Sequence, residues 1–159
     1  MGVAGSGKTT IGTRLSRQFG WEFADADDYH SAGNVAKMRN GIPLTDADRA
    51  PWLATLRGMI EEWIRGGKSA VLACSALKEE YRDELRVGRE VRFVYLKAAP
   101  AVLAERLRAR AAHYMKAGML ESQLETLEEP RDALVVDVSG TVEESVGAIV
   151  RGIGLAKTG

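Results

Sequence analysis

The sequence predicts an α/β fold in which helices cover both faces of a parallel sheet. Two observations lead to this prediction: helical and strand-like patterns alternate along all 159 residues, and a glycine-rich motif at the start is followed directly by an amphipathic pattern. Strands that alternate with helices pair in parallel, because each helix returns the chain to the same end of the sheet. The length fits one domain, so we predict a single domain over residues 1–159.

The glycine-rich motif is Gly2-Val3-Ala4-Gly5-Ser6-Gly7-Lys8-Thr9, which fits G-x-x-x-x-G-K-[ST], the P-loop pattern. Glycines let the backbone curl so that its N–H groups converge on phosphate oxygens at the N-terminus of a helix. Lys8 is expected to reach the β- and γ-phosphates, and the Thr9 hydroxyl to hold Mg²⁺. A chance glycine-rich turn is the alternative, but apolar side chains follow at helical spacing over residues 11–19. The motif therefore predicts nucleotide binding.

Only Met1 precedes this motif, although a P-loop normally follows a buried strand. Losing about four buried aliphatic side chains at ~1.5–3 kcal/mol each would rival the whole stability of a domain, about 5–15 kcal/mol. We therefore expect the first strand to be truncated in this sequence, with further residues upstream of Met1 in the natural protein or a misassigned start.

The remaining elements follow in order along the chain. Four strand-like runs complete a predicted five-stranded parallel sheet: Trp21–Ala24, Ser69–Cys74, Val91–Leu96 and Leu134–Val138. Helices are predicted at residues 31–38, 52–64 and 78–86, and from Pro100. Pro51 is expected in the first turn of the second of these. Thr141 with Glu144 three residues on forms a capping box that begins the last helix.

Composition narrows the class of protein. The 22 basic and 22 acidic residues balance, so we expect no nucleic-acid partner and no membrane surface. The single cysteine, Cys74, excludes an internal disulfide and lies in an apolar run, which favours a buried core position. Neither a run of about 18 apolar residues nor a signal peptide is present. A cytoplasmic enzyme is the expectation.

Acidic residues follow the first strand-like run. In extended backbone Asp25 and Asp27 face one way and Asp28 the other. Paired carboxylates beside a P-loop suit the water shell of Mg²⁺ and the proton of an attacking hydroxyl. The strand ending at Cys74 has no terminal aspartate, so Asp25 is the nearest candidate for the metal. The alternative is that these aspartates only cap the next helix or remain solvated.

A basic group lies in a predicted lid at about residues 106–125. Arg106, Arg110 and His113 are spaced four and three apart, so a continuing helix would carry them on one face. Such a face could close over a triphosphate and stabilise charge on the transferred phosphoryl group. A surface position is the alternative for His113, and His30 beside the carboxylates is the more favoured ligand contact.

Several segments together resemble the gluconokinases: GVAGSGKT, DADDYH, NVAKM, GIPLTDADRAPWL, VLACSALKEEYRD, FVYLK, RLRARAAHYM and MLESQLETLEEP. The resemblance covers most of the chain. It implies a P-loop kinase fold with a lid, and phosphorylation of the 6-hydroxyl of D-gluconate with ATP and Mg²⁺. It also implies a homodimer.

The resemblance and the motifs together give the predicted site. The catalytic residues are Lys8, Asp27 as the base, and Arg110. The ATP-binding residues are Gly2, Val3, Ala4, Gly5, Ser6, Gly7, Lys8, Thr9, Thr10, Arg106 and Arg110. The substrate-binding residues are Asp27, His30, Lys37, Arg49, Ser75, Lys78, Arg82, His113 and Gln123, and the metal ligands are Thr9 and Asp25.

The sequence also departs from the family. Ala112 stands where a glycine usually precedes the histidine, and the loop after Pro130 is short and poor in acids. Two other functions stay open beside the gluconokinase reaction. One is a related kinase with a shikimate-like or nucleotide acceptor, and the other is a nucleotide-binding regulatory module. A GTP-driven switch should carry the guanine signature N-K-x-D, which this sequence lacks.

Overall fold

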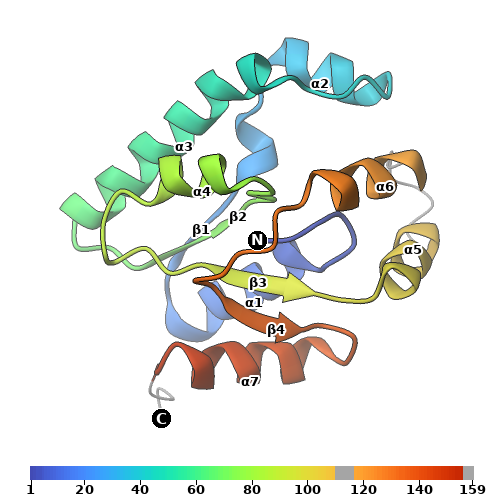
Figure 1. The fold of residues 1–159 in the computed structure, drawn as a ribbon. Coiled ribbons are helices and arrows are strands. Elements are labelled where there is room, and N and C mark those ends of the chain that lie inside the picture. The colour runs from blue at the N-terminus through green and yellow to red at the C-terminus, as the bar shows by residue number, and fades with distance from the viewer. Residues whose placement is uncertain (110–116, 156–159) are drawn as a thin grey trace.

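A computed structural model describes residues 1–109 and 117–155 (Figure 1). Its elements in chain order are α1 (Lys8–Phe19), β1 (Glu22–Asp25), the 3₁₀ helix η1 (Ala26–Tyr29), α2 (Ala32–Arg39), α3 (Asp46–Arg65), β2 (Ala70–Ala73), α4 (Glu79–Leu85), β3 (Val94–Lys97), α5 (Pro100–Ala109), α6 (Ala117–Thr126), β4 (Leu134–Asp137) and α7 (Val142–Gly152). The alternation and parallel pairing confirm the predicted α/β class.

The strands form two parallel pairs. β1 pairs with β2 in the register Glu22 to Ala70, and β3 pairs with β4 in the register Val94 to Leu134. Within the part of the chain that the structure describes, these are two two-stranded sheets. The strand predicted at Val91–Leu96 begins later than expected: β3 starts at Val94, and residues 91–93 are not part of a strand.

Met1 and Gly2 connect the two pairs. The Met1 nitrogen donates to the Val94 carbonyl at 2.6 Å, and the Leu96 N–H donates to the Met1 carbonyl at 2.9 Å. Gly2 donates to the Ser75 carbonyl, at the end of β2, at 3.2 Å. Residues 1–2 thus lie between the end of β2 and β3, bound to both through backbone hydrogen bonds.

Helices cover both faces of this arrangement (Figure 1). On one face, buried side chains of α3 and α4, including Leu56 and Leu85, pack with Cys74. On the other face, α1 and α7 pack on β3 and β4 around Leu15 and Ile149. Cys74 is a buried core residue, as predicted.

The start of α3 corrects one prediction. Thr45 is its N-cap and forms a capping box with Asp48, so the helix begins at Asp46 and Pro51 lies inside it rather than in a first turn. The capping box determines the start here, whereas the prediction relied on the proline alone. The capping box predicted at Thr141 and Glu144 is confirmed. Among the described residues, no helix is long and apolar enough to cross a membrane.

Candidate active site

The phosphate loop, residues 2–7, bends around the N-terminus of α1. Gly5 and Gly7 have φ of 82° and 85°, in the left-handed region that favours glycine. A Cβ on Gly5 would lie 3.0 Å from the Leu103 carbonyl oxygen of α5, so a larger residue would strain both segments. Ser6 is fully buried, and its Oγ has no hydrogen-bond partner among the described residues. Lys8 Nζ donates to the Val3 carbonyl inside the loop at 3.1 Å.

The two predicted metal ligands meet at the end of β1. Thr9 Oγ1, in the first turn of α1, donates to Asp25 Oδ2 at 2.6 Å. A hydroxyl and a carboxylate are hard oxygen ligands, which suit Mg²⁺ when water and phosphate oxygens complete its shell. Among the described residues, no group of three or more His, Cys, Asp or Glu residues forms a protein-only metal cluster. The arrangement therefore fits a cation held jointly by protein and nucleotide.

The backbone after Asp25 differs from the extended chain assumed above. Residues 26–29 form η1, so the alternating orientation of the three aspartates does not apply. Asp25 caps this short helix by accepting from the Asp27 N–H at 3.1 Å. The capping alternative and the metal-ligand prediction thus concern the same carboxylate, which uses Oδ1 for the cap and Oδ2 for Thr9.

Asp27 lies among several charged groups. Loss of hydration raises the pKa of its carboxyl, and the nearby Asp25 carboxylate raises it further. Lys8 and His30 act in the opposite direction, which places Asp27 within electrostatic reach of the phosphate loop and of the predicted pocket. Asp27, Asp25 and Lys8 are therefore close enough to interact electrostatically.

His30 is fixed by stacking. Its ring lies 4.4 Å from the Trp52 ring, centroid to centroid, with an interplanar angle of 13°. The Trp52 indole N–H donates to the Ala26 carbonyl of η1 at 2.7 Å. Partial burial lowers the pKa of His30, and its Nδ1 is buried without a partner among the described residues. A neutral imidazole with one ring nitrogen unsatisfied is suited to bind a hydroxyl group.

Two predicted cations, Arg49 and Lys78, meet around Tyr81. Both lie over its ring, at 5.6 Å and 5.4 Å from the centroid. Lys78 Nζ donates to both carboxylate oxygens of Asp46 at 2.8 and 2.9 Å, and the Tyr81 hydroxyl donates to the same carboxylate. Arg49 donates to the Tyr81 hydroxyl at 3.3 Å and to the Leu44 carbonyl at 2.7 Å. The Asp46 carboxylate thus accepts from Lys78 and Tyr81, while Arg49 lies 4.0 Å from it and donates to neutral oxygens.

Lys37 belongs to a neighbouring ion pair. Its Nζ lies 2.7 Å from Asp48 Oδ1, and Asp48 Oδ2 accepts from the Thr45 N–H at the start of α3. The first turn of α3 therefore supplies an acid to each of two predicted substrate cations, Asp46 to Lys78 and Asp48 to Lys37.

Arg82 has a different position from the one predicted. It is only 1% exposed, and one guanidinium nitrogen donates to the carbonyls of Ala76 and Leu77 at 3.0 Å each. It thus holds the loop 75–78, which carries two predicted site residues, Ser75 and Lys78. Ala76 in this loop has φ of 44°, a left-handed conformation.

The segment predicted as a lid, at about residues 106–125, is described only at residues 106–109 and 117–125. Arg106 donates to the carbonyls of Val138 and Gly140 at 2.5 and 3.4 Å, so it binds the turn between β4 and α7. Gln123 Oε1, on α6, accepts from the Ala4 N–H of the phosphate loop at 2.7 Å rather than lying free to face the acceptor. Thr10 is exposed in the first turn of α1. Arg110 and His113 lie outside the described residues.

Sequence reasoning missed three residues of the site: Asp46, Tyr81 and Trp52. Asp46 and Tyr81 lie within segments that carry the family resemblance, but their mutual contact depends on the packing of α3 against α4. Trp52 is buried in the core, and its stacking on His30 has no signal in the sequence.

The loop, the hydroxyl–carboxylate pair and the parallel strands define a P-loop nucleotide-binding domain, and a family model described as an AAA domain matches residues 1–130. The gluconokinase of Gluconobacter oxydans is 49% identical over 143 residues, which cover 88% of this chain and 80% of the relative. The thermoresistant gluconokinase of Escherichia coli is 41% identical over 155 residues, covering 94% and 89%.

A crystal structure of a gluconokinase from Sinorhizobium meliloti 1021 is similar with a TM-score of 0.86 and 41% identity, over 97% of this chain and 89% of that one. The chain belongs to the AAA domain family of the matching model and to the gluconokinase family.

Proposed function

We propose that this chain transfers the γ-phosphoryl group of ATP to the 6-hydroxyl of D-gluconate, giving 6-phosphogluconate and ADP. The observation that carries the proposal is that one structure contains a phosphate loop and two groups of side chains that could bind the phosphoryl acceptor. One is Asp27, which lies within electrostatic reach of Lys8, and the other is the cation group of Arg49, Lys78 and Tyr81. Membership of the gluconokinase family supports the choice of acceptor.

On the nucleotide side, loop N–H groups and Lys8 would bind the phosphates at the N-terminus of α1. Thr9 and Asp25 would hold Mg²⁺, which neutralises charge on the phosphate oxygens when bound. Arg110 is proposed to add positive charge from the lid. Because phosphoryl transfer depends on positioning and electrostatic stabilisation, these groups supply most of the required chemistry.

On the acceptor side, Asp27 would accept the proton of the attacking 6-hydroxyl as the oxygen bonds to phosphorus and the bond to ADP breaks. A raised pKa makes its carboxylate a stronger base than that of an ordinary aspartate. His30, held by Trp52, would bind a substrate hydroxyl through its imidazole ring.

The substrate carboxylate is proposed to bind Arg49 and Lys78, with Tyr81 between them. An Arg side chain offers a planar pair of donors that matches a carboxylate. Lys37 and His113 are proposed to complete the pocket, and Gln123 to connect α6 to the phosphate loop through Ala4.

An ADP-release assay over a panel of acceptors tests this function. Gluconate should give the highest kcat/KM, and shikimate and nucleoside monophosphates should give rates near the background of ATP hydrolysis. Turnover with shikimate or a nucleotide in place of gluconate would identify a related kinase, and nucleotide binding without turnover of any acceptor would identify a regulatory module. A cytoplasmic location and a homodimer remain predictions, which fractionation and sedimentation would check.

A further inference from the structure

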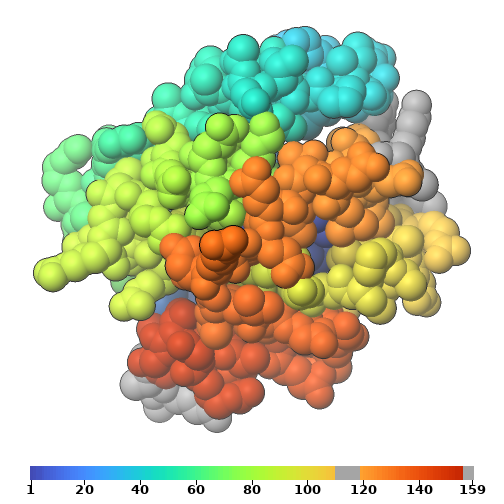
Figure 2. Space-filling view, in the orientation of Figure 1, coloured from blue at the N-terminus to red at the C-terminus, as the bar shows by residue number. Residues whose placement is uncertain are grey.

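α6 and the residues that follow it contact two loops of the candidate site. One is the phosphate loop, and the other is the loop of residues 75–78, which we call the acceptor loop because it carries the predicted substrate residues Ser75 and Lys78. In Figure 2 the orange surface that includes α6 lies between α4, which follows the acceptor loop, and α5, which lies against the phosphate loop at Gly5. α6 is thus placed to connect the two halves of the proposed site.

Gln123 makes the contact with the phosphate loop. Its Oε1 accepts from the Ala4 N–H at 2.7 Å. One helical turn further along, the Leu127 N–H donates to the Gln123 carbonyl at 2.9 Å, so the helical backbone continues to the residue before Glu128. Gln123 and Glu128 are therefore joined by one regular turn rather than by a loop.

Glu128 makes the contact with the acceptor loop, through both its backbone and its side chain. Its N–H donates to the Leu77 carbonyl at 2.9 Å, and its carboxylate accepts from the N–H of Glu79, the first residue of α4, at 2.6 Å. Lys78, the N-cap of α4, forms no side-chain capping bond, so Glu128 supplies an acceptor that the start of this helix otherwise lacks. Two bonds from one residue thus hold the end of the acceptor loop.

Apolar packing joins the same segments. One core cluster contains Val3 of the phosphate loop, Leu77 of the acceptor loop and Leu120 of α6, which are 3%, 5% and 6% exposed. Leu103 of α5 also belongs to this cluster, and Leu127 packs against it. The two loops and α6 therefore share a hydrophobic core in addition to the hydrogen bonds.

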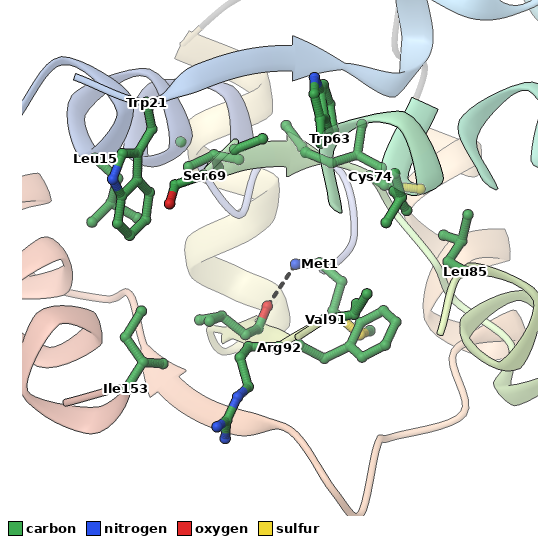
Figure 3. Close-up of a pocket in the computed structure, with 18 of the residues that line it drawn as sticks. Met1, Leu15, Trp21, Trp63, Ser69, Cys74, Leu85, Val91, Arg92 and Ile153 are labelled. Carbon is green, nitrogen blue, oxygen red and sulfur yellow. Dashed lines mark hydrogen bonds between the residues drawn. The ribbon is translucent and has the colours of Figure 1, made fainter. Parts of the chain in front are cut away.

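The contacts with α6 hold parts of the two loops that other backbone bonds leave unfixed. Gly2 donates to the Ser75 carbonyl at 3.2 Å, and the nitrogen of Met1 donates to the Val94 carbonyl, as Figure 3 shows. These bonds hold the first residue of each loop. The residues further along, which are proposed to bind phosphate and acceptor, are held from α6.

We propose that Gln123 and Glu128 are positioning residues that set the distance and orientation between bound ATP and the acceptor hydroxyl. The inference rests on the proposed kinase function. Arg82 holds the acceptor loop in its own conformation, whereas Gln123 and Glu128 hold it relative to the phosphate loop. Because phosphoryl transfer depends on the alignment of donor and acceptor, loss of either contact should reduce turnover more than the binding of either substrate.

Glu128→Ala tests the contact at the acceptor loop. We expect kcat with gluconate to fall at least about tenfold, since a misplacement of about 1 Å can cost about 10²-fold, while KM for ATP and for gluconate changes less than about threefold. Glu128→Gln keeps an oxygen that accepts from the Glu79 N–H and should retain at least about half of kcat. Equal losses in the alanine and glutamine variants would overturn the proposal.

Glu129→Ala is the matched control. It removes the next carboxylate along the chain, which contacts Lys97 and Tyr95 of β3 rather than either loop. This variant should keep kcat within about twofold of the unmodified chain. A loss equal to that of Glu128→Ala would show that negative charge on this segment is required, rather than the contact with Glu79, and would overturn the proposal.

A double variant tests whether the two residues act as one connection. Gln123→Met removes the acceptor for the Ala4 N–H at similar volume and should also lower kcat at least about tenfold. If breaking the connection at one end is sufficient, Gln123→Met combined with Glu128→Ala should lose no more than about twofold beyond the larger single loss. Losses that multiply would mean two independent effects, which contradicts a single connection.

Hydrogen exchange gives a readout that does not need turnover. A nonhydrolysable ATP analogue should slow amide exchange at residues 77–82 in the unmodified chain and in Glu129→Ala, but not in Glu128→Ala. If Glu128→Ala does not fold, Gln123→Met takes its place in this comparison. No slowing in the unmodified chain, or equal slowing in all three forms, would overturn the proposal. If no acceptor is turned over, the proposed function fails by itself, and the exchange measurement still decides whether α6 couples the two loops.

Discussion

Arg82 donates a hydrogen bond to the carbonyl of Ala76, the described non-glycine residue whose backbone has positive φ. A left-handed conformation costs an alanine roughly 1–2 kcal/mol, and the buried guanidinium offsets this cost by bonding Ala76 and Leu77 together. The same loop ends at Lys78, whose ammonium lies in the cation group. Arg82 is therefore a positioning residue that acts on the substrate pocket through the backbone.

Replacing this guanidinium should affect substrate binding more than turnover. We expect Arg82→Lys to lower stability by about 1–3 kcal/mol, because two buried carbonyls lose their donor. KM for gluconate should rise several-fold while KM for ATP changes little. Adding Ala76→Gly to this variant should recover part of both losses, since glycine adopts the conformation without strain. Steady-state kinetics and urea titration measure these effects, and failure of glycine to recover either one would refute the positioning role.

Asp27 is expected to determine the rate of transfer. Asp27→Asn should lower kcat by about 10²–10⁴-fold, as for loss of a general base, and change nucleotide affinity less than about threefold. Asp28→Asn is the matched control, one residue along the same 3₁₀ helix. Single-turnover kinetics and nucleotide titration provide the measurements. Comparable losses in the two variants would mean that charge near the loop, rather than a base, is required.

The raised pKa of Asp27 predicts the acidic side of the pH profile. Loss of hydration and the Asp25 charge disfavour the carboxylate, so kcat/KM for gluconate should begin to fall at a higher pH than the usual aspartate pKa of about 4. Because the folded chain binds this proton more tightly than the unfolded chain, ionised Asp27 reduces stability. Asp27→Asn should therefore unfold at an equal or higher temperature at pH 7, and a lower midpoint would contradict the assignment.

The contact between Thr9 and Asp25 predicts how activity depends on Mg²⁺. Thr9→Ser retains the hydroxyl and should keep most of the activity, whereas Thr9→Val keeps the shape but removes the oxygen. We expect the valine variant to need at least about tenfold more Mg²⁺ for half-maximal rate, equivalent to roughly 1.4 kcal/mol. Magnesium titrations at saturating ATP measure this difference. If the two variants need the same Mg²⁺ concentration for half-maximal rate, the Thr9 hydroxyl is not a metal ligand.

Asp48 predicts a loss of stability in acid. Its bond to Lys37, together with the bonds at Thr45, lowers its pKa from 3.8 to about 2. A carboxyl with a lowered pKa contributes stability that is complete above about pH 4 and disappears as pH falls toward 2. Asp48→Asn should lower the thermal midpoint at pH 7 and flatten its change between pH 4 and 2. If the thermal midpoint of the variant still changes with pH between 4 and 2 as in the unmodified chain, other carboxyl groups account for the loss of stability in acid.

Local signals in the sequence predicted the phosphate loop and much of the fold. The P-loop pattern specified Lys8 and Thr9 because their roles follow from fixed spacing, and the alternation of patterns specified parallel pairing. The capping box at Thr141 likewise depends on residues three apart. Such features need only neighbours along the chain, which is why sequence alone identified them.

Features that depend on packing could not be read in this way. The 3₁₀ turn after Asp25 broke the assumed alternation of the aspartates, because the Asp25 side chain caps a helix instead of continuing a strand. Arg82 is buried against the carbonyls of Ala76 and Leu77, in the loop that leads into α4, and an arginine in a family motif gives no sign of this position. Contacts between distant segments decide both cases.

Trp52 joins the hydrophobic core to the reaction chemistry. Its indole is buried in the same core cluster as Leu56 of α3, yet its N–H donates to the carbonyl of Ala26, one residue before Asp27, and its ring stacks on His30. The position of Asp27, the proposed base, thus depends on the hydrophobic core. Trp52→Phe would keep much of the apolar volume but remove the hydrogen bond beside Asp27, without changing any residue proposed to bind the substrate.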